Sequence, residues 1–374
     1  MPATTLPPFP DNVQTHPLLV IDYELIKKGD ANEIARLWKA ATELGFWYLR
    51  NHGVGKEVDE MFDMGAETMA LPLSEKLRFE QGDDGQSFGY KAAGANATDD
   101  AGNPDTVEFI NVAKDDVLSF PAVTHRTYPD TVEVRMESTL KPFLTKSLEV
   151  TNKILEVFER QLGLPEGAFA DRHKMLESSG SETRCIKNPA KRRPAPNAVT
   201  YEPTAADEEK AALGAHTDFG SISFLHNRLG GLQVLPPGYD TWQYVRPISG
   251  HAICNVGDTL TLLSGGILRS NLHRVVTPPG EQAFFERWSL VFFLRPSIDV
   301  PLYPLTKESD AIVDAVDHMT EDDKKRYYPV SDDGKASTAG EWFARRIKMQ
   351  RLKNRTGPES YRASRGMEHN PKAI

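Results

Sequence analysis

The chain has 374 residues, 39% of them hydrophobic, which is enough to bury a sizeable core. Its formal net charge of −9 disfavours a nucleic-acid partner, because such a partner requires a basic face. The longest apolar run, about seven residues at 288–294, is far shorter than the ~20 residues that span a bilayer, and the N-terminus does not read as a secretory signal. Two cysteines form no disulfide or zinc pattern. We therefore expect a soluble, cytoplasmic globular protein without a nucleic-acid or membrane partner.

The N-terminal part of the chain is predicted to mix helices with short strands. Residues 1–16 are rich in proline and indicate an extended arm. Asp30 and Glu33 resemble a helix capping box, and apolar residues follow at helical spacing until Gly45 ends the helix. The other elements expected here are strands at 18–22, 46–49 and 107–112, a helix at 58–70, a short helix from Ser74, and a long loop at 81–105 of the kind that often forms a lid.

The remainder of the chain is predicted to be mainly β-structure. A long amphipathic helix at 141–162 supports the sheet from outside, a strand follows at 184–188, and residues 189–210 form an exposed insertion. From Ala211 onward, short strands alternate with turns, which is typical of a jelly roll. A basic helix at 339–353 packs against this barrel. We expect a mixed α/β, mainly β fold, divided into an arm (1–16), an N-terminal region (17–125) and a jelly-roll domain (126–374), together forming one compact unit.

Three residues form a candidate metal site. His216 and Asp218 are two positions apart, so in an extended strand both side chains point to the same face. His273 follows His216 by 57 residues, in a segment of strand and turn character that could return beside the first. Two imidazoles and one carboxylate leave three coordination positions open, which is the arrangement that non-haem Fe(II) oxygenases use.

A second pair, Arg287 and Ser289, shows the same spacing inside an apolar run. A buried arginine without an anionic partner costs several kcal/mol, so this arginine requires a carboxylate from the protein or from a ligand.

Together these motifs resemble the 2-oxoglutarate- and Fe(II)-dependent dioxygenases, in particular the branch that includes isopenicillin N synthase. Other phrases similar to that branch are GAHTDFGSISFL, GGLQV, NVGDTL, LSGGILRSNLHRV and, near the N-terminus, LLVIDY and ELGFWYLRNHGV. The resemblance implies a double-stranded β-helix core in which Fe(II) is bound by His216, Asp218 and His273. It also implies 2-oxoglutarate and dioxygen as co-substrates, with Arg287 and Ser289 binding the far carboxylate of 2-oxoglutarate.

The resemblance leaves two questions open. The family adds a further side chain to the co-substrate carboxylates, and either Asn188 or Tyr201 fits that position. The activity implied is hydroxylation or desaturation of a small metabolite, with release of succinate. The alternatives are an Fe(II) oxidase of the isopenicillin N synthase type, which does not use 2-oxoglutarate, and a catalytically silent ligand-binding relative.

Strand alternation from Arg287, together with what the resemblance implies about these positions, predicts residues that face the substrate. Phe293 and Arg295 fall on the same face, and Arg184 could face them from a neighbouring strand. Two cations beyond the one assigned to 2-oxoglutarate favour an anionic small-molecule substrate that is held by Arg295 and packs on Phe293. An equally good interpretation is that Arg295 forms an ion pair with one of the many acidic residues of the surface.

Overall fold

A large sheet runs through the molecule and takes strands from both ends of the sequence. The computed structural model describes residues 6–193, 211–320, 324 and 336–365. Eight strands pair in the order β1-β2-β10-β7-β12-β5-β4-β3. Their bounds are β1 Val20–Asp22, β2 Phe46–Arg50, β3 Gly89–Lys91, β4 Glu108–Ala113, β5 Glu182–Asn188, β7 Ile222–Asn227, β10 Ala252–Val256 and β12 Arg287–Leu294.

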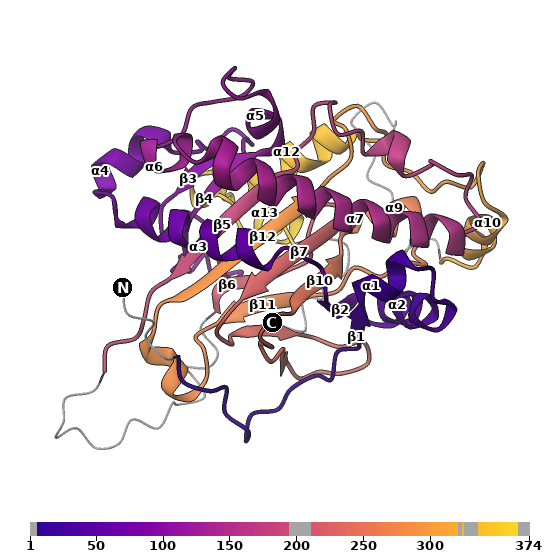
Figure 1. The fold of residues 1–374 in the computed structure, drawn as a ribbon, viewed down its shortest axis with the longest axis horizontal. Helices are drawn as coiled ribbons and strands as arrows, with labels where there is room; N and C mark the ends of the chain where they lie inside the picture. Colours follow the sequence, from indigo (N-terminus) through magenta and orange to yellow (C-terminus); the bar gives the residue numbers. More distant parts are fainter. Residues whose placement is uncertain (1–5, 194–210, 321–323, 325–335, 366–374) are drawn as a thin grey trace.

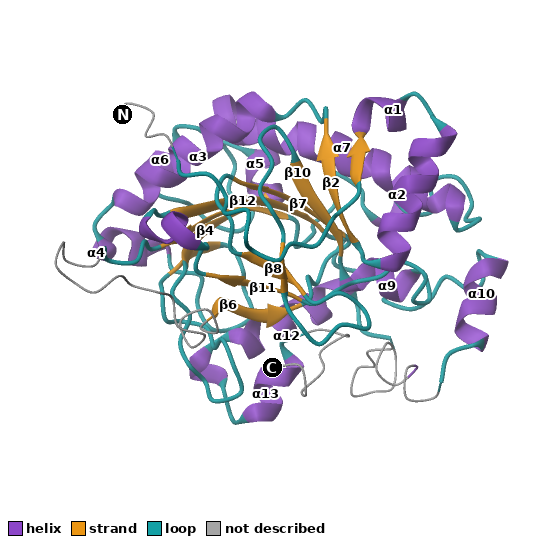
Figure 2. Ribbon diagram, turned by 90° about the horizontal axis from the view of Figure 1, so that it is seen from below, coloured by secondary structure: helices purple, strands orange, loops and turns teal. Residues whose placement is uncertain are grey.

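A smaller sheet faces the large one. Its four strands pair in the order β6-β11-β8-β9, with bounds β6 Ala211–His216, β11 His273–Val276, β8 Leu232–Val234 and β9 Gln243–Tyr244. Figure 2 shows this sheet on the side of the large sheet opposite to α3 and α7. Two facing sheets are the jelly-roll arrangement that the turn spacing predicted, and the mixed α/β class is confirmed. The described helices contain more residues than the strands, while the strands form the two sheets.

Helices cover the outer face of the large sheet. The predicted long helix is α7, and it crosses the sheet together with α3 in Figure 1. Its buried face includes Phe143, Leu144 and Phe158, which lie in the main hydrophobic core. The helices are α1 Tyr23–Lys27, α2 Ala31–Glu43, α3 Gly55–Ala70, α4 Leu73–Lys76, α5 Lys114–Ser119, α6 Asp130–Glu133, α7 Lys141–Gln161, α9 Asp258–Leu263, α10 Asp310–Asp317, α12 Ala339–Gln350 and α13 Pro358–Ala363.

The N-terminal region is joined to the rest of the chain through this sheet. Strand β2 pairs with β10, which is more than 200 residues later, so both predicted regions share one sheet. The capping box expected at α2 is only half formed. Asp30 accepts a hydrogen bond from the Glu33 N–H, but the Glu33 carboxylate accepts from the Asp22 N–H instead and so ties α2 to β1.

The C-terminal helix α12 packs on the barrel, as its apolar residues predicted. Trp342 and Ile347 are buried, whereas the helix ends at Gln350 and not at residue 353. Sequence periodicity gave no indication that Arg346 is also buried, with its guanidinium 2.8 Å from the Asp258 carboxylate at the start of α9. A buried ion pair therefore joins the C-terminal helix to the core.

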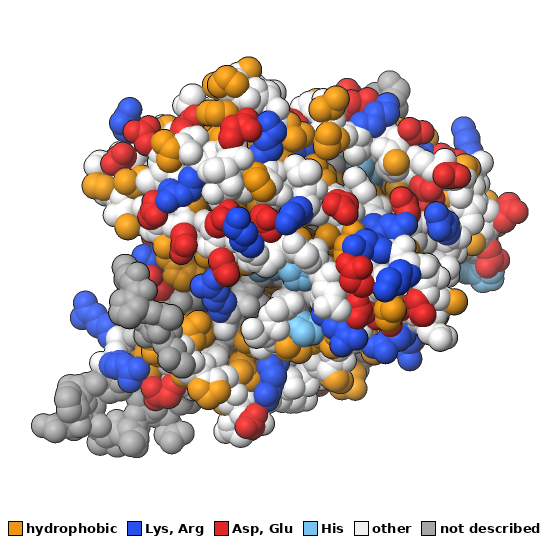
Figure 3. Space-filling model, in the orientation of Figure 1, with side chains coloured by type: hydrophobic (Ala, Val, Ile, Leu, Met, Phe, Trp, Pro, Cys, Tyr) orange, Lys and Arg blue, Asp and Glu red, His pale blue; other side chains and the backbone are white. Residues whose placement is uncertain are grey.

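The surface over the helices carries acidic and basic side chains interspersed with one another (Figure 3). Among the described helices, none combines the length and the apolarity needed to cross a membrane.

Candidate metal centre and co-substrate site

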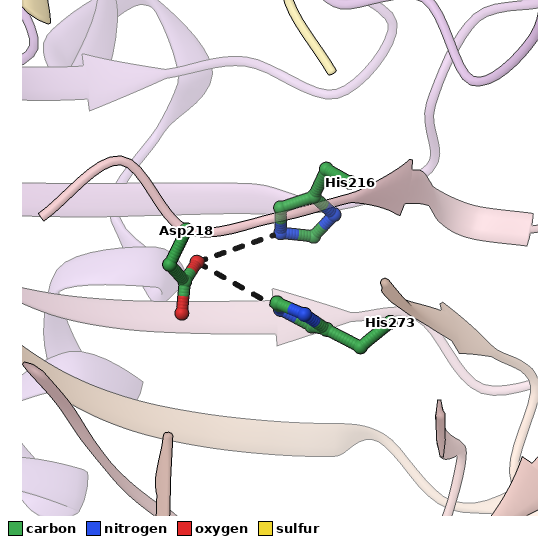
Figure 4. Close-up of side chains that lie close together, drawn as sticks. All are labelled: His216, Asp218 and His273. Atoms are coloured by element: carbon green, nitrogen blue, oxygen red, sulfur yellow. Dashed lines mark ion pairs between the residues drawn. The ribbon is translucent and has the colours of Figure 1, made fainter. Parts of the chain in front are cut away.

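The three predicted metal ligands lie together between the two sheets (Figure 4). The Nε2 atoms of His216 and His273 are each 3.7 Å from Oδ1 of Asp218. One donor atom from each residue lies within 4.8 Å of the other two, and no second group of three such residues occurs in the described part of the chain. All three side chains are largely shielded from solvent, so a metal ion held here would be bound inside the protein.

Strand pairing brings the two histidines together. Strand β11 runs antiparallel to β6, and His273 is the direct partner of His216. The Nδ1 atom of each ring is next to a backbone carbonyl two residues earlier, Gly214 at 2.8 Å and Asn271 at 3.2 Å. A proton on Nδ1 satisfies that carbonyl, so the lone pair of Nε2 is directed at the metal position.

Asp218 reaches the site by a different route from the one expected. Strand β6 ends at His216, so Asp218 lies in the following turn and not two places along the same strand. The turn is fixed by Thr217, whose hydroxyl donates to Asp258 at 2.9 Å, and by the Asp258 N–H, which donates to the Asp218 carbonyl at 2.8 Å. The buried ion pair of Asp258 with Arg346 therefore stabilises the turn that carries Asp218.

The second oxygen of Asp218 is held by two neighbours. The hydroxyl of Ser223 donates to it at 2.5 Å and the amide of Asn255 at 2.8 Å, which leaves Oδ1 facing the histidines. Burial by itself would raise the pKa of Asp218, but the two histidines and these hydrogen bonds lower it below its usual value. Burial lowers the pKa of His216. An ionised carboxylate and neutral imidazoles are the protonation states that bind a divalent cation, so the donor set fits Fe(II).

Arg287 is a buried cation beside this site. Its Nε donates to the Gly230 carbonyl at 2.6 Å and its Nη1 to the Ser289 hydroxyl at 2.5 Å. No carboxylate of the described chain forms an ion pair with it, and burial lowers the pKa of Arg287 to about 10, so it remains charged at neutral pH. Arg287 and Ser289 line the same cavity as the three metal ligands. A buried guanidinium that faces a cavity without an anion fits a bound carboxylate such as that of 2-oxoglutarate.

The structure explains the two glycines of the sequence GGLQV. Gly230 supplies the carbonyl that orients Arg287, and Gly231 has φ of +102°, in a region that side chains disfavour. A Cβ atom on Gly231 would lie 2.6 Å from the Val276 carbonyl and 3.2 Å from Nε of Arg287. Glycine is therefore required for the chain to pass this close to the arginine.

The predicted substrate residues all line the cavity, but two of them already have a partner. Arg184 and Arg295 both donate to one oxygen of the buried Glu182, at 2.8 and 3.2 Å, and Arg295 also donates to the Gly180 carbonyl. Phe293 lies between them, with its ring centre 4.9 Å from one guanidinium and 5.0 Å from the other. The acidic partner of Arg295 is thus a core residue, Glu182, and not one of the surface acids.

The two candidates for the additional 2-oxoglutarate ligand have different outcomes. Asn188 is the strand partner of Arg287 in β5, but its Oδ1 accepts from the Thr106 hydroxyl at 3.0 Å and the residue is not in the cavity wall. Tyr201 lies outside the described residues. The role of either residue remains a prediction.

Several residues that line the cavity were not identified from the sequence. Asn96 and Ala97 come from the loop predicted as a lid, and Gln350 and Arg365 come from the end of the chain. Asn255, which orients Asp218, lies in the phrase NVGDTL that contributed to the family resemblance. The loop length gave a signal for Asn96 and Ala97, whereas nothing in the local pattern distinguished Arg365 from the other basic residues of the tail.

Comparison with known proteins agrees with this geometry. Residues 193–296 match the sequence model of the 2OG-Fe(II) oxygenase superfamily, and residues 18–132 match that of the non-haem dioxygenase N-terminal region, described from morphine synthesis. A 2-oxoglutarate-dependent dioxygenase of Aspergillus fumigatus is 28% identical over 80% of each chain. A 1-aminocyclopropane-1-carboxylate oxidase of Dictyostelium mucoroides is 26% identical over 90% of this chain and 95% of its own length.

The fold is shared with solved structures as well. A full-length Neurospora crassa protein, crystallised with alpha-KG, superposes with a TM-score of 0.68 at 22% identity, over 88% of this chain and 95% of that one. The chain belongs to the 2OG-Fe(II) oxygenase superfamily. It is an Fe(II)- and 2-oxoglutarate-dependent dioxygenase.

Proposed function

We propose that this dioxygenase hydroxylates or desaturates a small, carboxylate-bearing metabolite in the cavity between the two sheets. The use of 2-oxoglutarate is supported by the buried Arg287, which has no carboxylate partner in the described chain and faces the cavity of the His-Asp-His group. The observation that carries the carboxylate of the substrate is the pair of further arginines in that cavity, Arg184 and Arg295, which share a single carboxylate. Fe(II), when bound by His216, Asp218 and His273, supplies the activation of dioxygen that couples decarboxylation of 2-oxoglutarate to oxidation of a C–H bond. The regions 17–125 and 126–374 act as one unit, and two unpaired buried cysteines agree with a reducing, cytoplasmic compartment.

The protein groups bind, orient and exclude water. Arg287 presents its planar fork to the far carboxylate of 2-oxoglutarate, while the Ser289 hydroxyl, which accepts from Arg287, can donate its own proton to the same carboxylate. The apolar side chains of Ile186, Leu225 and Val291 line the cavity and keep water away from the reacting atoms.

An anionic substrate is supported by two further cations in the wall of the cavity. Arg184 and Arg295 together carry two positive charges, and their shared partner Glu182 carries one negative charge. This cluster therefore retains a net positive charge toward the cavity, with Phe293 available for the carbon skeleton.

The activity is tested by measuring succinate release and dioxygen uptake with the Fe(II)-loaded protein and a panel of small carboxylic acids. We expect succinate to form in proportion to the 2-oxoglutarate consumed, and to form faster with the true substrate. Substrate oxidation without succinate would indicate instead an oxidase of the isopenicillin N synthase type. Binding of 2-oxoglutarate without any turnover across the panel would favour a silent relative.

Replacement of Arg287 by lysine tests the co-substrate site. We expect the KM for 2-oxoglutarate to rise at least roughly tenfold, about 1.4 kcal/mol, because an ammonium group cannot reproduce the two parallel hydrogen bonds of the guanidinium. Substrate affinity, measured separately, should change less. Lys187→Arg in the neighbouring strand, where the side chain forms a surface ion pair with Glu286, is the control and should leave both values unchanged. An unaltered KM for 2-oxoglutarate in Arg287→Lys would refute the assignment.

A further inference from the structure

The segment at 350–365 forms one wall of the cavity together with the loop at 94–105, through Gln350 and Arg365 on one side and Asn96 and Ala97 on the other. The Leu352 N–H donates to the Ala95 carbonyl at 3.0 Å, and the Tyr361 hydroxyl donates to the Thr98 carbonyl at 2.6 Å. The guanidinium of Arg365 donates to the Ala97 carbonyl at 2.8 Å. Figure 2 shows α13 on the outer side of the small sheet, next to β6. These hydrogen bonds hold the segment 351–365 against the loop, so the segment and the loop together form this wall of the cavity.

Arg365 is the charged residue that this segment contributes to the cavity. It is 4% exposed, and its Nη1 donates to the Ala215 carbonyl at 2.6 Å, one residue before the metal ligand His216. Its own carbonyl accepts from the Thr217 N–H at 2.9 Å, so its backbone is bound to the metal-binding turn. Nε of Arg365 is buried without a hydrogen-bond partner in the described chain. The centre of the Tyr361 ring lies 3.6 Å from Cζ of Arg365, so the ring packs against the guanidinium.

The charged groups around the cavity fall into two sets. Near the metal, Fe(II) and Arg287 balance Asp218 and the two carboxylates of 2-oxoglutarate. In the second set, Arg184 and Arg295 share Glu182, and the side chain of Arg365 donates only to carbonyl groups. Asp99 and Asp100 are near enough to favour the charged form of Arg365, but neither forms an ion pair with it in the described chain. In this second set, two arginines share one carboxylate, and Arg365 has no ion-pair partner in the described chain.

From this arrangement we infer that Arg365 binds the carboxylate of the substrate, and that the docked C-terminal segment completes the substrate site. The inference rests on the proposed function, because it assigns the substrate-binding cation of that same cavity. Arg365 suits this role better than Arg184 or Arg295, since both of those already donate to a carboxylate. A substrate carboxylate at Arg365 would give an ion-pair partner to a buried charge whose side-chain hydrogen bonds, within the described chain, go only to carbonyl groups.

The test compares matched acids and amides. The probes are a panel of aromatic and alicyclic carboxylic acids, each with its primary amide, titrated into protein loaded with Mn(II) and 2-oxoglutarate in the absence of dioxygen. We expect at least one acid to bind the wild-type protein about tenfold or more tightly than its amide, as a charge-assisted hydrogen bond of ~1.5–3 kcal/mol allows. Arg365→Gln should abolish this preference, Arg365→Lys should retain part of it, and the affinity for 2-oxoglutarate should not change.

Two further variants separate a local role from a structural one. Lys353→Gln removes an exposed cation from the same segment and should keep the full preference for acids. Tyr361→Phe removes the hydrogen bond to Thr98 without touching a charge, and should weaken acid binding about threefold or more while sparing 2-oxoglutarate. If Arg365→Gln does not fold, Arg365→Lys and Tyr361→Phe decide the question.

The outcomes that contradict the inference are also defined. A wild-type protein that binds 2-oxoglutarate but shows no preference for any acid over its amide would overturn it. An equal loss of preference in Lys353→Gln, or full preference in Arg365→Gln, would do the same. Failure of the wild-type protein to bind 2-oxoglutarate would instead overturn the proposed function.

Discussion

Replacing His216 and His273 together by alanine is expected to abolish succinate formation and tight Fe(II) binding. The double variant leaves Asp218 as the one remaining protein ligand, and a single carboxylate does not hold a divalent cation against water. Fe(II) affinity can be measured by anaerobic titration, and turnover by succinate release. Replacing His216, Asp218 or His273 singly by alanine should also abolish activity, because the three donor atoms lie within 4.8 Å of one another and are placed to bind one ion.

The control for this experiment is His318→Ala. His318 follows α10 and its side chain is 78% exposed, so its removal should change neither metal affinity nor turnover. Asn255→Ala gives an intermediate case. It removes the hydrogen bond that orients Asp218 and should cost about 10–100-fold in metal affinity or activity. Full activity in the double variant would exclude this group as the metal site.

Replacing Arg346 by methionine is expected to destabilise the protein by about 3–5 kcal/mol, because it leaves the Asp258 carboxylate buried without its cation. Asp258 is fully buried and Arg346 is 1% exposed, so solvent cannot compensate for the lost pair. Burial already raises the pKa of Asp258 even with the arginine present. The free energy of unfolding, measured in urea, gives the effect directly.

A matched control lies on the same helix. Lys348 is exposed, so Lys348→Met should change the free energy of unfolding by less than about 0.5 kcal/mol. The double variant Asp258→Leu with Arg346→Met should be less destabilised than Arg346→Met, since no unpaired charge remains. Equal stability of Arg346→Met and the wild type would show that this pair does not hold α12 to the core.

The same pair links stability to the metal site. Asp258 also accepts from the Thr217 hydroxyl, and Thr217 lies between two of the metal ligands. A variant that loses Asp258 should therefore lose metal affinity as well as stability, whereas a core replacement remote from the turn should affect stability alone.

The sequence by itself determined the chemistry of the centre. His216 with Asp218, and Arg287 with Ser289, were identified from residue type and two-residue spacing, whereas the assignment of His273 and the roles of all these residues followed from the resemblance to the family. The structure brings all five to one cavity. The long helix α7 and the succession of short strands followed from hydrophobic periodicity, which is a local property of the chain.

The tertiary structure decided which partner each buried charge has. The spacing that placed Arg295 in the cavity could not reveal that Glu182, 113 residues away, would already be bound to it. Local pattern likewise treated Arg346 and Arg365 as ordinary cations of a basic tail, although both are buried. Hydrophobic periodicity records which face of an element is covered, but the partner of a charge depends on which distant segments pack together. For that reason the partners of the charged residues in the cavity wall, including the part of the wall that Gln350 and Arg365 contribute, emerged only from the folded chain.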